Sequence, residues 1–289
     1  MGPASAGGDA RPEGADDLLT LVADWPVKQA AVGVTDPDGT LGTGGDEAWV
    51  APIASVTKLL AGLAALVAVE EGAIELDEPA GPEGSTVRHL LAHASGLPFE
   101  GDVPIAPPGK RRIYSNSGIE RFAEHLARRA GMPFEEYLRL GVLEPLAMGA
   151  TDLRGSPAHG ARSSVADLLK LGRELLRPTL VAAETIALAT TSQFANLGGV
   201  VPNIGRFEPN PWGLTFEIRG EKEPHWTGRR NAPATFGHFG GSGTFLWVDP
   251  TAGLAAVALT DRTFGPWALQ VWPAFSDGML ERYAPSRGW

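Results

Sequence analysis

The chain has 289 residues, a formal net charge of −10, 43% hydrophobic residues and no cysteine. This length exceeds the usual size of one compact domain, so we expect two packed lobes or one large domain with a long insertion. The negative charge makes nucleic acid and anionic membrane surfaces poor partners. Without cysteine, disulfide bonds, thiolate metal sites and cysteine catalysis are excluded.

The amino-terminal segment, residues 1–15, is rich in Gly, Ala, Pro and Asp and is predicted to be disordered. It has neither the apolar core nor the early basic cluster of a secretory signal, so we expect a cytoplasmic protein. Export with the signal already removed is the alternative. The longest strongly apolar stretch, from Leu59 to Val69, is too short to span a bilayer and predicts a buried helix.

The segments before Ser55 predict one helix and one hairpin. Asp16 and Asp17 precede LLTLVADW, which predicts a helix with acidic residues in its first turn. The next segments, QAAVGVT, DPDG and TLGTGG, predict two strands joined by a tight turn.

From Ser55 onward the apolar residues recur with a helical period, and Gly72 is a stop signal for the first helix. Further helices are predicted in VRHLLAHASG, GIERFAEHLARRAG, FEEYLRLGVLEPL and SSVADLLKLGRELL. After about residue 205, strands are predicted in WGLTFEI and TFGHFGG, and a hairpin in GTFLWVDPTAGLAAVALTD. A last helix is predicted from Pro273 to Tyr283, beginning at proline.

This order of elements predicts an α/β (α+β) fold. An antiparallel sheet built from both ends of the chain, residues 16–54 and 205–289, would be flanked by helices. A mainly helical lobe, residues 55–204, would be inserted between its strands.

Ser55 and Lys58 form a Ser-x-x-Lys motif at the start of the predicted buried helix. Residues three apart lie on one helical face, so the Lys58 amine can act as the base that a serine nucleophile needs. A lysine that is neutral near pH 7 requires a pKa lowered by roughly 3 units, or about 4 kcal/mol. Taken alone, the motif also fits a helix cap at Ser55 and a solvated charge at Lys58.

Two further segments accompany this motif: Tyr114-Ser115-Asn116 and His238-Phe239-Gly240-Gly241. In this order, the three resemble the signature motifs of the penicillin-recognising serine hydrolases, above all class C β-lactamases, D-alanyl-D-alanine carboxypeptidases and family VIII carboxylesterases. The resemblance extends from about residue 28 to residue 262. It includes the flanking segments LLAHASGLP, YSNSGIERFAEHLARRAG and LEPLAMGAT.

The resemblance implies a β-lactamase/transpeptidase-like fold and a role for each matching residue. Ser55 matches the nucleophile that forms an acyl-enzyme, and Lys58 matches the lysine that shares its proton. Tyr114 matches the tyrosine that acts as base, and Asn116 matches the asparagine that holds the lysine and the substrate amide. The backbone N–H groups of Ser55 and Gly241 match the oxyanion hole. No cofactor and no metal are implied.

The third motif departs from the family pattern, because His238-Phe239-Gly240 replaces the usual Lys-Thr/Ser-Gly that helps to bind a substrate carboxylate. Gly240 and Gly241 still allow substrate to approach the strand closely. We therefore expect a serine esterase or amidase that acts on an uncharged small-molecule ester or amide. The alternatives are a true β-lactamase or D-alanyl-D-alanine carboxypeptidase, and a non-catalytic binding protein on the same fold. The oligomeric state is not predicted.

Four other residues have two interpretations each. An extended chain puts Arg112 on the same side as Tyr114, where it would bind a substrate carboxylate or remain a solvated charge. Trp212 would line the acyl pocket or belong to the core. His89 and His93 have the spacing of metal ligands, but no carboxylate lies between them, and a structural role is favoured.

Overall fold

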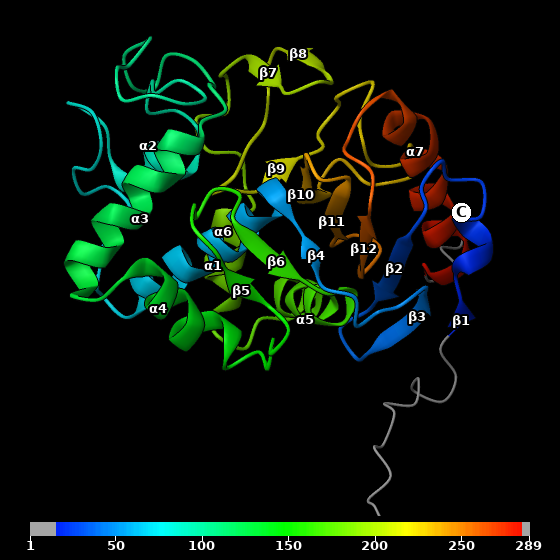
Figure 1. The fold of residues 1–289 in the computed structure, drawn as a ribbon. Coiled ribbons are helices and arrows are strands. Elements are labelled where there is room, and N and C mark those ends of the chain that lie inside the picture. The colour runs from blue at the N-terminus through cyan, green and yellow to red at the C-terminus, as the bar shows by residue number, and fades with distance from the viewer. Residues whose placement is uncertain (1–15, 285–289) are drawn as a thin grey trace, which may run out of the picture.

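The large sheet joins strands from the two ends of the chain (Figure 1). The computed structural model describes residues 16–284, so the prediction for residues 1–15 lies outside the described residues. All neighbouring strands pair antiparallel except β1 and β3, which are parallel. In spatial order the strands are β1 (Asp16–Asp17), β3 (Thr40–Gly44), β2 (Ala30–Thr35), β12 (Leu254–Thr260), β11 (Thr244–Asp249), β10 (Phe236–Gly240) and β9 (Glu217–Ile218).

Two hairpins set the register at the centre of this sheet. In the turn between β2 and β3, the Asp36 carboxylate accepts hydrogen bonds from the N–H groups two and three residues further along. Asp249 does the same in the turn between β11 and β12. Such aspartate turns reverse the chain without regular pairing. Because β12 pairs with β2, the two hairpins lie side by side, and the predicted antiparallel sheet from both ends of the chain is confirmed.

Helices α5 (Val165–Leu176) and α7 (Pro266–Tyr283) cover opposite faces of the sheet (Figure 1). Successive side chains of a strand point to opposite faces, and β11 separates them accordingly. Leu246 lies in the apolar cluster that contains α5, whereas Phe245 contacts Trp272 of α7, with ring centroids 4.9 Å apart.

Small residues on the sheet let α5 approach closely. A Cβ at Gly33 of β2 would lie 2.8 Å from the Leu169 side chain, and one at Gly172 of α5 would lie 2.9 Å from the Cβ of Ala255. Distances this short are not tolerated between real carbon atoms, so glycine is needed on both sides of the contact. Helix α5 therefore packs on the sheet, although it falls within residues 55–204 that the sequence assigns to the helical lobe.

The other helices surround α1 (Thr57–Glu70), whose residues from Thr57 to Ala68 are all buried. Apolar residues on every side of this segment predict such burial. The helix ends as expected, with Gly72 in the left-handed region at φ +72°. Around it lie α2 (Val87–Leu91), α3 (Asn116–Ala130), α4 (Phe134–Leu138), η3 (Arg139–Leu143) and α6 (Ala183–Ala189), with the short strands β4 (Ala51–Pro52), β5 (Asp152–Leu153), β6 (Ala161–Ser163), β7 (Gly199–Val201) and β8 (Gly205–Phe207).

Two predicted elements are shorter in the structure. The helix predicted after Asp17 is only a 3-10 turn, η1 (Leu19–Leu21), because the chain before it pairs with β3 and the Leu18 N–H donates to a carbonyl of that strand. The strand predicted in WGLTFEI is limited to the two residues of β9. Thr215 interrupts it with a left-handed backbone, φ +71°, which is incompatible with a continuous strand.

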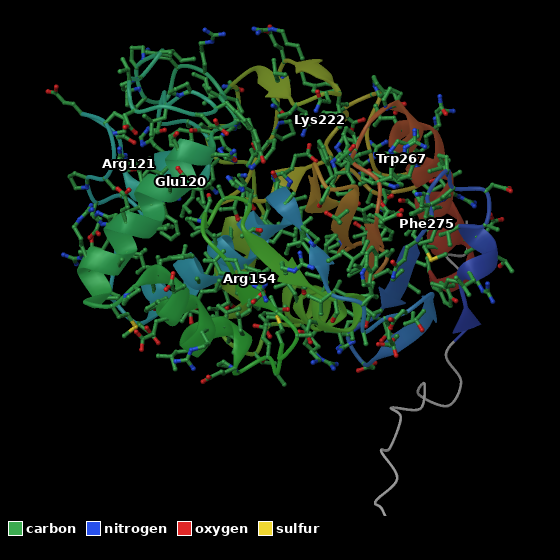
Figure 2. The ribbon with its side chains drawn as sticks, in the orientation of Figure 1. Glu120, Arg121, Arg154, Lys222, Trp267 and Phe275 are labelled. Atoms are coloured by element: carbon green, nitrogen blue, oxygen red, sulfur yellow. The ribbon has the colours of Figure 1, made fainter. Side chains whose placement is uncertain are left out.

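The last helix begins at Pro266, not at Pro273 as predicted. Proline fits the first turn of a helix because the missing N–H has no partner there. Pro273 lies inside the helix, where Trp267 and Phe275 bury their rings against Trp25 and offset the lost hydrogen bond (Figure 2). Within residues 16–284, no helix is both long and apolar enough to cross a membrane.

Candidate active site

Ser55 lies in the 3-10 turn η2 (Ala54–Val56), which leads directly into α1. Strand β10 passes beside this turn: a Cβ at Gly240 would lie 2.3 Å from the Ile53 carbonyl oxygen. Thr244 fixes the same carbonyl by donating its hydroxyl to it at 3.0 Å. Glycine at position 240 is therefore required for the third motif to approach the turn that carries Ser55.

Lys58 is fully buried, and its amine faces three oxygen atoms. Its Nζ lies 3.4 Å from Ser55 Oγ, 2.7 Å from Asn116 Oδ1 and 2.9 Å from the Ala158 carbonyl oxygen. Burial lowers the pKa of Lys58 to about 7, against a smaller raising effect of the Glu120 carboxylate. This lowering of the pKa of Lys58 has the direction that a lysine base requires.

The arrangement around Lys58 accommodates both protonation states of its amine, because an ammonium can donate to all three oxygens. A neutral amine has two N–H donors and one lone pair. The Asn116 and Ala158 oxygens accept from the two donors. The remaining direction faces Ser55 Oγ, so the lone pair is available to accept the Ser55 proton.

Tyr114 forms the wall beside this amine. Lys58 Nζ lies 4.7 Å from the centre of the Tyr114 ring. Burial raises the pKa of Tyr114, and the nearby Ser55 side chain lowers it by less. Tyr114 is therefore a neutral phenol in the free protein, and Lys58 is the group ready to take a proton.

The chain around Tyr114 is held by His93 and Ser115. The Ser115 N–H donates to His93 Nδ1 at 3.1 Å, and the Ser115 hydroxyl donates to the Pro98 carbonyl at 2.6 Å. Ser115 Oγ also caps α3 by accepting from the Gly118 N–H at 2.9 Å. Burial lowers the pKa of His93 well below its usual value, so its ring is neutral and accepts at Nδ1.

His89 and His93 each contact a neighbouring polar group of the chain. His89 Nδ1 lies 2.9 Å from the Thr86 hydroxyl, and His93 is occupied as described above. In the part of the chain that the structure describes, no group of three or more histidine or acidic side chains is placed to hold a metal ion. Both histidines have the structural surroundings that the sequence favoured.

His238 and Trp212 complete an aromatic cluster against Tyr114. Their rings lie 5.6 Å and 5.7 Å from the Tyr114 ring and 5.8 Å from each other. His238 Nδ1 lies 2.6 Å from the Phe239 carbonyl oxygen, to which it donates. Burial lowers the pKa of His238 to about 3, so the ring is neutral and carries no charge for a substrate carboxylate.

The rest of the third motif and Trp212 face apolar surroundings. The Phe239 ring packs against Phe264, with centroids 4.4 Å apart. The Gly241 carbonyl accepts from the Phe264 N–H at 3.0 Å, and nothing lies within 4 Å of a Cβ built on Gly241. Trp212 is buried, yet its neighbours include Tyr114 and His238, so it belongs to the site as well as to the core.

Arg112 does not take either role expected from the sequence. It is buried, and its guanidinium donates to four main-chain carbonyl oxygens, those of Ala92 (2.5 Å), Gln193 (2.6 Å), Asn210 (3.1 Å) and Phe194 (3.3 Å). A buried guanidinium that donates to four main-chain carbonyls is not a solvated charge, and it is committed to these carbonyls rather than to a substrate carboxylate. The expected carboxylate-binding role is therefore corrected: Arg112 joins the loops around Tyr114.

Sequence analysis missed a buried charged network beneath Trp212. Glu217 forms an ion pair with Lys222 and contacts His225 Nε2 at 3.0 Å and Trp226 Nε1 at 2.8 Å. Lys222 Nζ lies 5.7 Å from the Trp212 ring. The segment EIRGEKEPHW contains these residues, but nothing in its spacing distinguishes buried charges from exposed ones.

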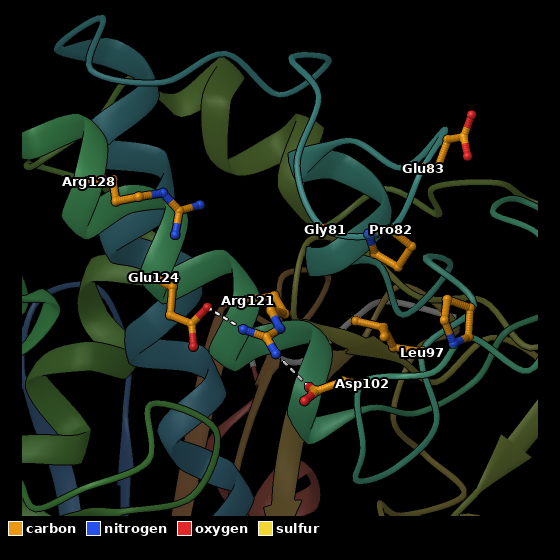
Figure 3. Close-up of a pocket in the computed structure, with 9 residues that line it drawn as sticks. Gly81, Pro82, Glu83, Leu97, Asp102, Arg121, Glu124 and Arg128 are labelled. Carbon is orange, nitrogen blue, oxygen red and sulfur yellow. Dashed lines mark hydrogen bonds and ion pairs between the residues drawn. The ribbon is translucent and has the colours of Figure 1, made fainter.

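A surface cleft beside α3 lies apart from the residues described above (Figure 3). Arg121 lies at its centre and is held between Asp102 (2.6 Å) and Glu124 (2.7 Å). Neither Ser55 nor Lys58 lines this cleft. It is therefore a separate feature of the surface.

Comparison with known proteins identifies the class of this site. The family model described as β-lactamase matches residues 21–275, and the chain therefore belongs to the β-lactamase family. It is a serine hydrolase of that family. The chain is similar to a β-lactamase of Mycobacterium bovis, with 54% identity and a TM-score of 0.91 over 92% of this chain and 99% of that one.

Curated relatives agree at lower identity. A β-lactamase of Pseudomonas fluorescens is 24% identical over 73% of this chain and 79% of that protein. A β-lactamase of Escherichia coli is 28% identical over 37% of this chain and only 36% of that protein. The chain thus matches about a third of the Escherichia coli enzyme. These similarities place the protein in its family without naming its substrate.

Proposed function

We propose that the protein hydrolyses an uncharged ester or amide through an acyl-enzyme on Ser55, with esters preferred. The observation that supports this preference is that neither His238 nor Arg112 is placed as a free cation beside the third motif. Burial keeps His238 neutral, and the donors of Arg112 are taken up by main-chain carbonyls. A substrate carboxylate placed against this buried surface would lose its hydration without gaining a positive partner.

The proposed acylation begins at Lys58. Its neutral amine takes the Ser55 hydroxyl proton as Ser55 Oγ forms a bond to the substrate carbonyl carbon. The Lys58 ammonium so formed is stabilised by the Asn116 and Ala158 oxygens and by the Tyr114 ring. The carbonyl oxygen becomes an oxyanion, which the N–H groups of Ser55 and Gly241 are assigned to stabilise.

Collapse of the tetrahedral intermediate breaks the bond to the leaving group. The leaving oxygen or nitrogen takes a proton from the Tyr114 hydroxyl, and Tyr114 recovers it from the Lys58 ammonium. Water then attacks the acyl-enzyme, with its proton passing to the same pair, and the acid product leaves with Ser55 restored. Because Lys58 and Tyr114 exchange one proton throughout, they titrate as a pair.

Hydrolysis of β-lactams is the second candidate function, and the similarity to the β-lactamase of Mycobacterium bovis favours it. The two candidates share Ser55, Lys58 and Tyr114 and differ in whether the substrate carries a carboxylate that must be bound. A comparison of p-nitrophenyl butyrate with nitrocefin separates them. We expect kcat/KM for the ester to exceed that for the β-lactam by more than tenfold. The reverse ranking would contradict the ester preference.

A probe experiment tests catalysis at Ser55 independently of the substrate. The protein is incubated with a fluorophosphonate, and the modified peptide is located by mass spectrometry, with Ser55→Ala as control. We expect one adduct, on Ser55, which the control lacks. A wild-type protein without this adduct would support a non-catalytic binding protein on the same fold.

A further inference from the structure

Glu120 lies on α3 one turn after Asn116, on the side of the helix that faces the turn of residues 156–160. Figure 2 shows its position on that helix. Its side chain is half-buried. Residues four apart lie on the same face of a helix, so Asn116 and Glu120 approach the same neighbouring segment from consecutive turns.

A chain of hydrogen bonds connects the Glu120 carboxylate to the amine of Lys58. The Ser156 hydroxyl donates to Glu120 Oε1 at 2.6 Å, and Ser156 Oγ accepts from the Ala158 N–H at 3.1 Å. The carbonyl oxygen of the same Ala158 accepts from Lys58 Nζ at 2.9 Å. The carboxylate therefore fixes the residue whose carbonyl holds the amine.

The turn that carries Ala158 is closed by its own backbone. The N–H groups of His159 and Gly160 donate to the Ser156 carbonyl at 3.2 Å and 2.7 Å. The Ala161 N–H donates to Thr57 Oγ1 at 3.1 Å, which attaches the turn to the start of α1. Ser156 and Thr57 thus hold the two ends of a short rigid segment, and Glu120 acts on the first of them.

We propose that Glu120 is a positioning residue for the serine hydrolase reaction. Through Ser156 it holds the Ala158 carbonyl against Lys58, and its negative charge favours the ammonium form of Lys58. This proposal rests on the proposed function of Ser55 and Lys58. It assigns Glu120 no contact with substrate.

The other titratable groups that face Lys58 leave Glu120 as the opposing charge. Tyr114 is neutral because burial raises its pKa. Burial lowers the pKa values of His93 and His238, and the charge of Lys58 lowers them further, so both rings are neutral. Burial lowers the pKa of Lys58, and Glu120 raises it. Removing the Glu120 charge therefore extends the range of the neutral amine to lower pH.

The test is the pH dependence of Ser55 phosphonylation by a fluorophosphonate, measured as a second-order rate constant in the full chain. Glu120→Gln keeps an acceptor for Ser156 and removes the charge. We expect the acid limb of the profile to move to lower pH by about half a unit. At pH 6 the variant should react roughly two to three times faster than the wild type, and at pH 8 the two should react equally. A damaged fold would slow the reaction at both pH values, so a faster reaction at pH 6 with an equal rate at pH 8 is not explained by structural damage.

Three control variants sharpen the result. Glu124→Gln also removes one negative charge from α3, one turn after Glu120. Glu124 pairs with Arg121 in the cleft of Figure 3, so this substitution should leave the pH profile unchanged. Glu120→Asp keeps the charge and should keep the wild-type acid limb. Ser156→Ala keeps the charge but breaks the link to Ala158, and should lower the plateau rate severalfold without moving the limb.

The outcomes separate this inference from the function it rests on. In one outcome, the wild type reacts at Ser55 with a rate that falls below about pH 7, and Glu120→Gln shows the same pH profile. This result would overturn the role of Glu120 and leave the proposed function intact. If Ser156→Ala had the same plateau rate constant as the wild type, the proposal that Ser156 holds the Ala158 carbonyl against Lys58 would be overturned. A wild type that does not react at Ser55 would overturn the proposed function itself.

Discussion

Two buried lysines of this protein, Lys58 and Lys222, are equally hidden from solvent and have opposite surroundings. Lys58 contacts an amide oxygen, a main-chain carbonyl and a hydroxyl. Lys222 forms an ion pair with the buried Glu217. Burial lowers the pKa of both lysines, but the carboxylate beside Lys222 opposes this directly, whereas the nearest opposing charge on Lys58 acts from a distance.

The difference shows how one kind of side chain serves two purposes. A buried lysine that faces neutral oxygens has little to stabilise its positive form and becomes a base near neutral pH. A buried lysine that faces a carboxylate keeps its charge and holds structure together, because breaking the pair leaves an uncompensated charge. Lys58 faces Ser55 at 3.4 Å, while Lys222 and Glu217 form an ion pair on the Trp212 side of the site.

The largest expected effect is loss of catalysis on removing the base. Lys58→Met should lower kcat/KM for p-nitrophenyl butyrate by about 10³-fold or more, because Ser55 loses its proton acceptor. Its melting temperature should not fall, since an apolar side chain of similar length replaces a buried amine. Lys58→Arg is the matched control: it keeps a cation that does not deprotonate and should be equally inactive. If the Lys58→Arg variant kept a tenth of the wild-type activity, Lys58 would not be the base that accepts the Ser55 proton.

Lys222→Met should produce the opposite pattern. Glu217 would remain buried without its cation, and the free energy of unfolding should fall by about 3–5 kcal/mol. The activity of the folded fraction should stay within about tenfold of wild type, because Lys222 contacts Trp212 and not Ser55. Urea unfolding and kcat/KM are measured on the same samples.

The double variant Lys222→Met with Glu217→Gln is the control for this prediction. It should recover part of the lost stability, because no unpaired charge remains. If Lys222→Met instead lost activity like Lys58→Met and kept its stability, the two lysines would not divide their roles in this way.

Tyr114→Phe should have a smaller effect on catalysis. The ring beside Lys58 is kept, but the hydroxyl that passes the proton to the leaving group is lost, so kcat should fall by about 10²-fold. Phe99→Leu is a useful control. The Phe99 ring stacks on the Tyr114 ring, with centroids 5.9 Å apart, but it has no group that can transfer a proton. A Tyr114→Phe enzyme no slower than this control would exclude Tyr114 from proton transfer.

The last prediction concerns the pH dependence of the wild type, which needs no substitution. Lys58 must be neutral to accept the Ser55 proton, and burial lowers its pKa to about 7. The ammonium form accumulates below this pH, so kcat/KM should be level above about pH 7 and fall tenfold per pH unit below it. Because burial raises the pKa of Tyr114, no fall is expected up to pH 10. A profile level down to pH 5 would show that Lys58 does not act as the base.

The sequence contains much of the fold and of the reacting groups. The turns DPDG and DPTAG between apolar runs predict the two hairpins, and the all-apolar helix after Ser55 predicts a buried centre. The three motifs predict which residues meet, and the structure brings Ser55, Lys58 and Asn116 together. These features are local in the chain or repeat a family pattern.

What the sequence could not predict depends on distant packing. The Ala158 carbonyl is a main-chain atom without a signature, and only the fold brings it to Lys58. The sequence around Arg112 is typical of an exposed, charged segment. In the structure, however, its guanidinium is surrounded by four main-chain carbonyls from segments distant in the chain. Glu217 begins the short strand β9 and Lys222 lies in the segment after it, and their burial depends on the sheet and on Trp212.

The most direct test of the account is the titration of Lys58 itself. The lysine side chains are labelled with ¹⁵N at Nζ and followed by NMR from pH 5 to pH 11, with Lys58→Arg and Lys222→Arg used for assignment. We predict one Nζ signal that titrates near pH 7 and is missing in Lys58→Arg, while the Lys222 signal persists in that variant. A Lys58 signal that remains that of an ammonium up to pH 10 would contradict the proposal that Lys58 is the base that activates Ser55.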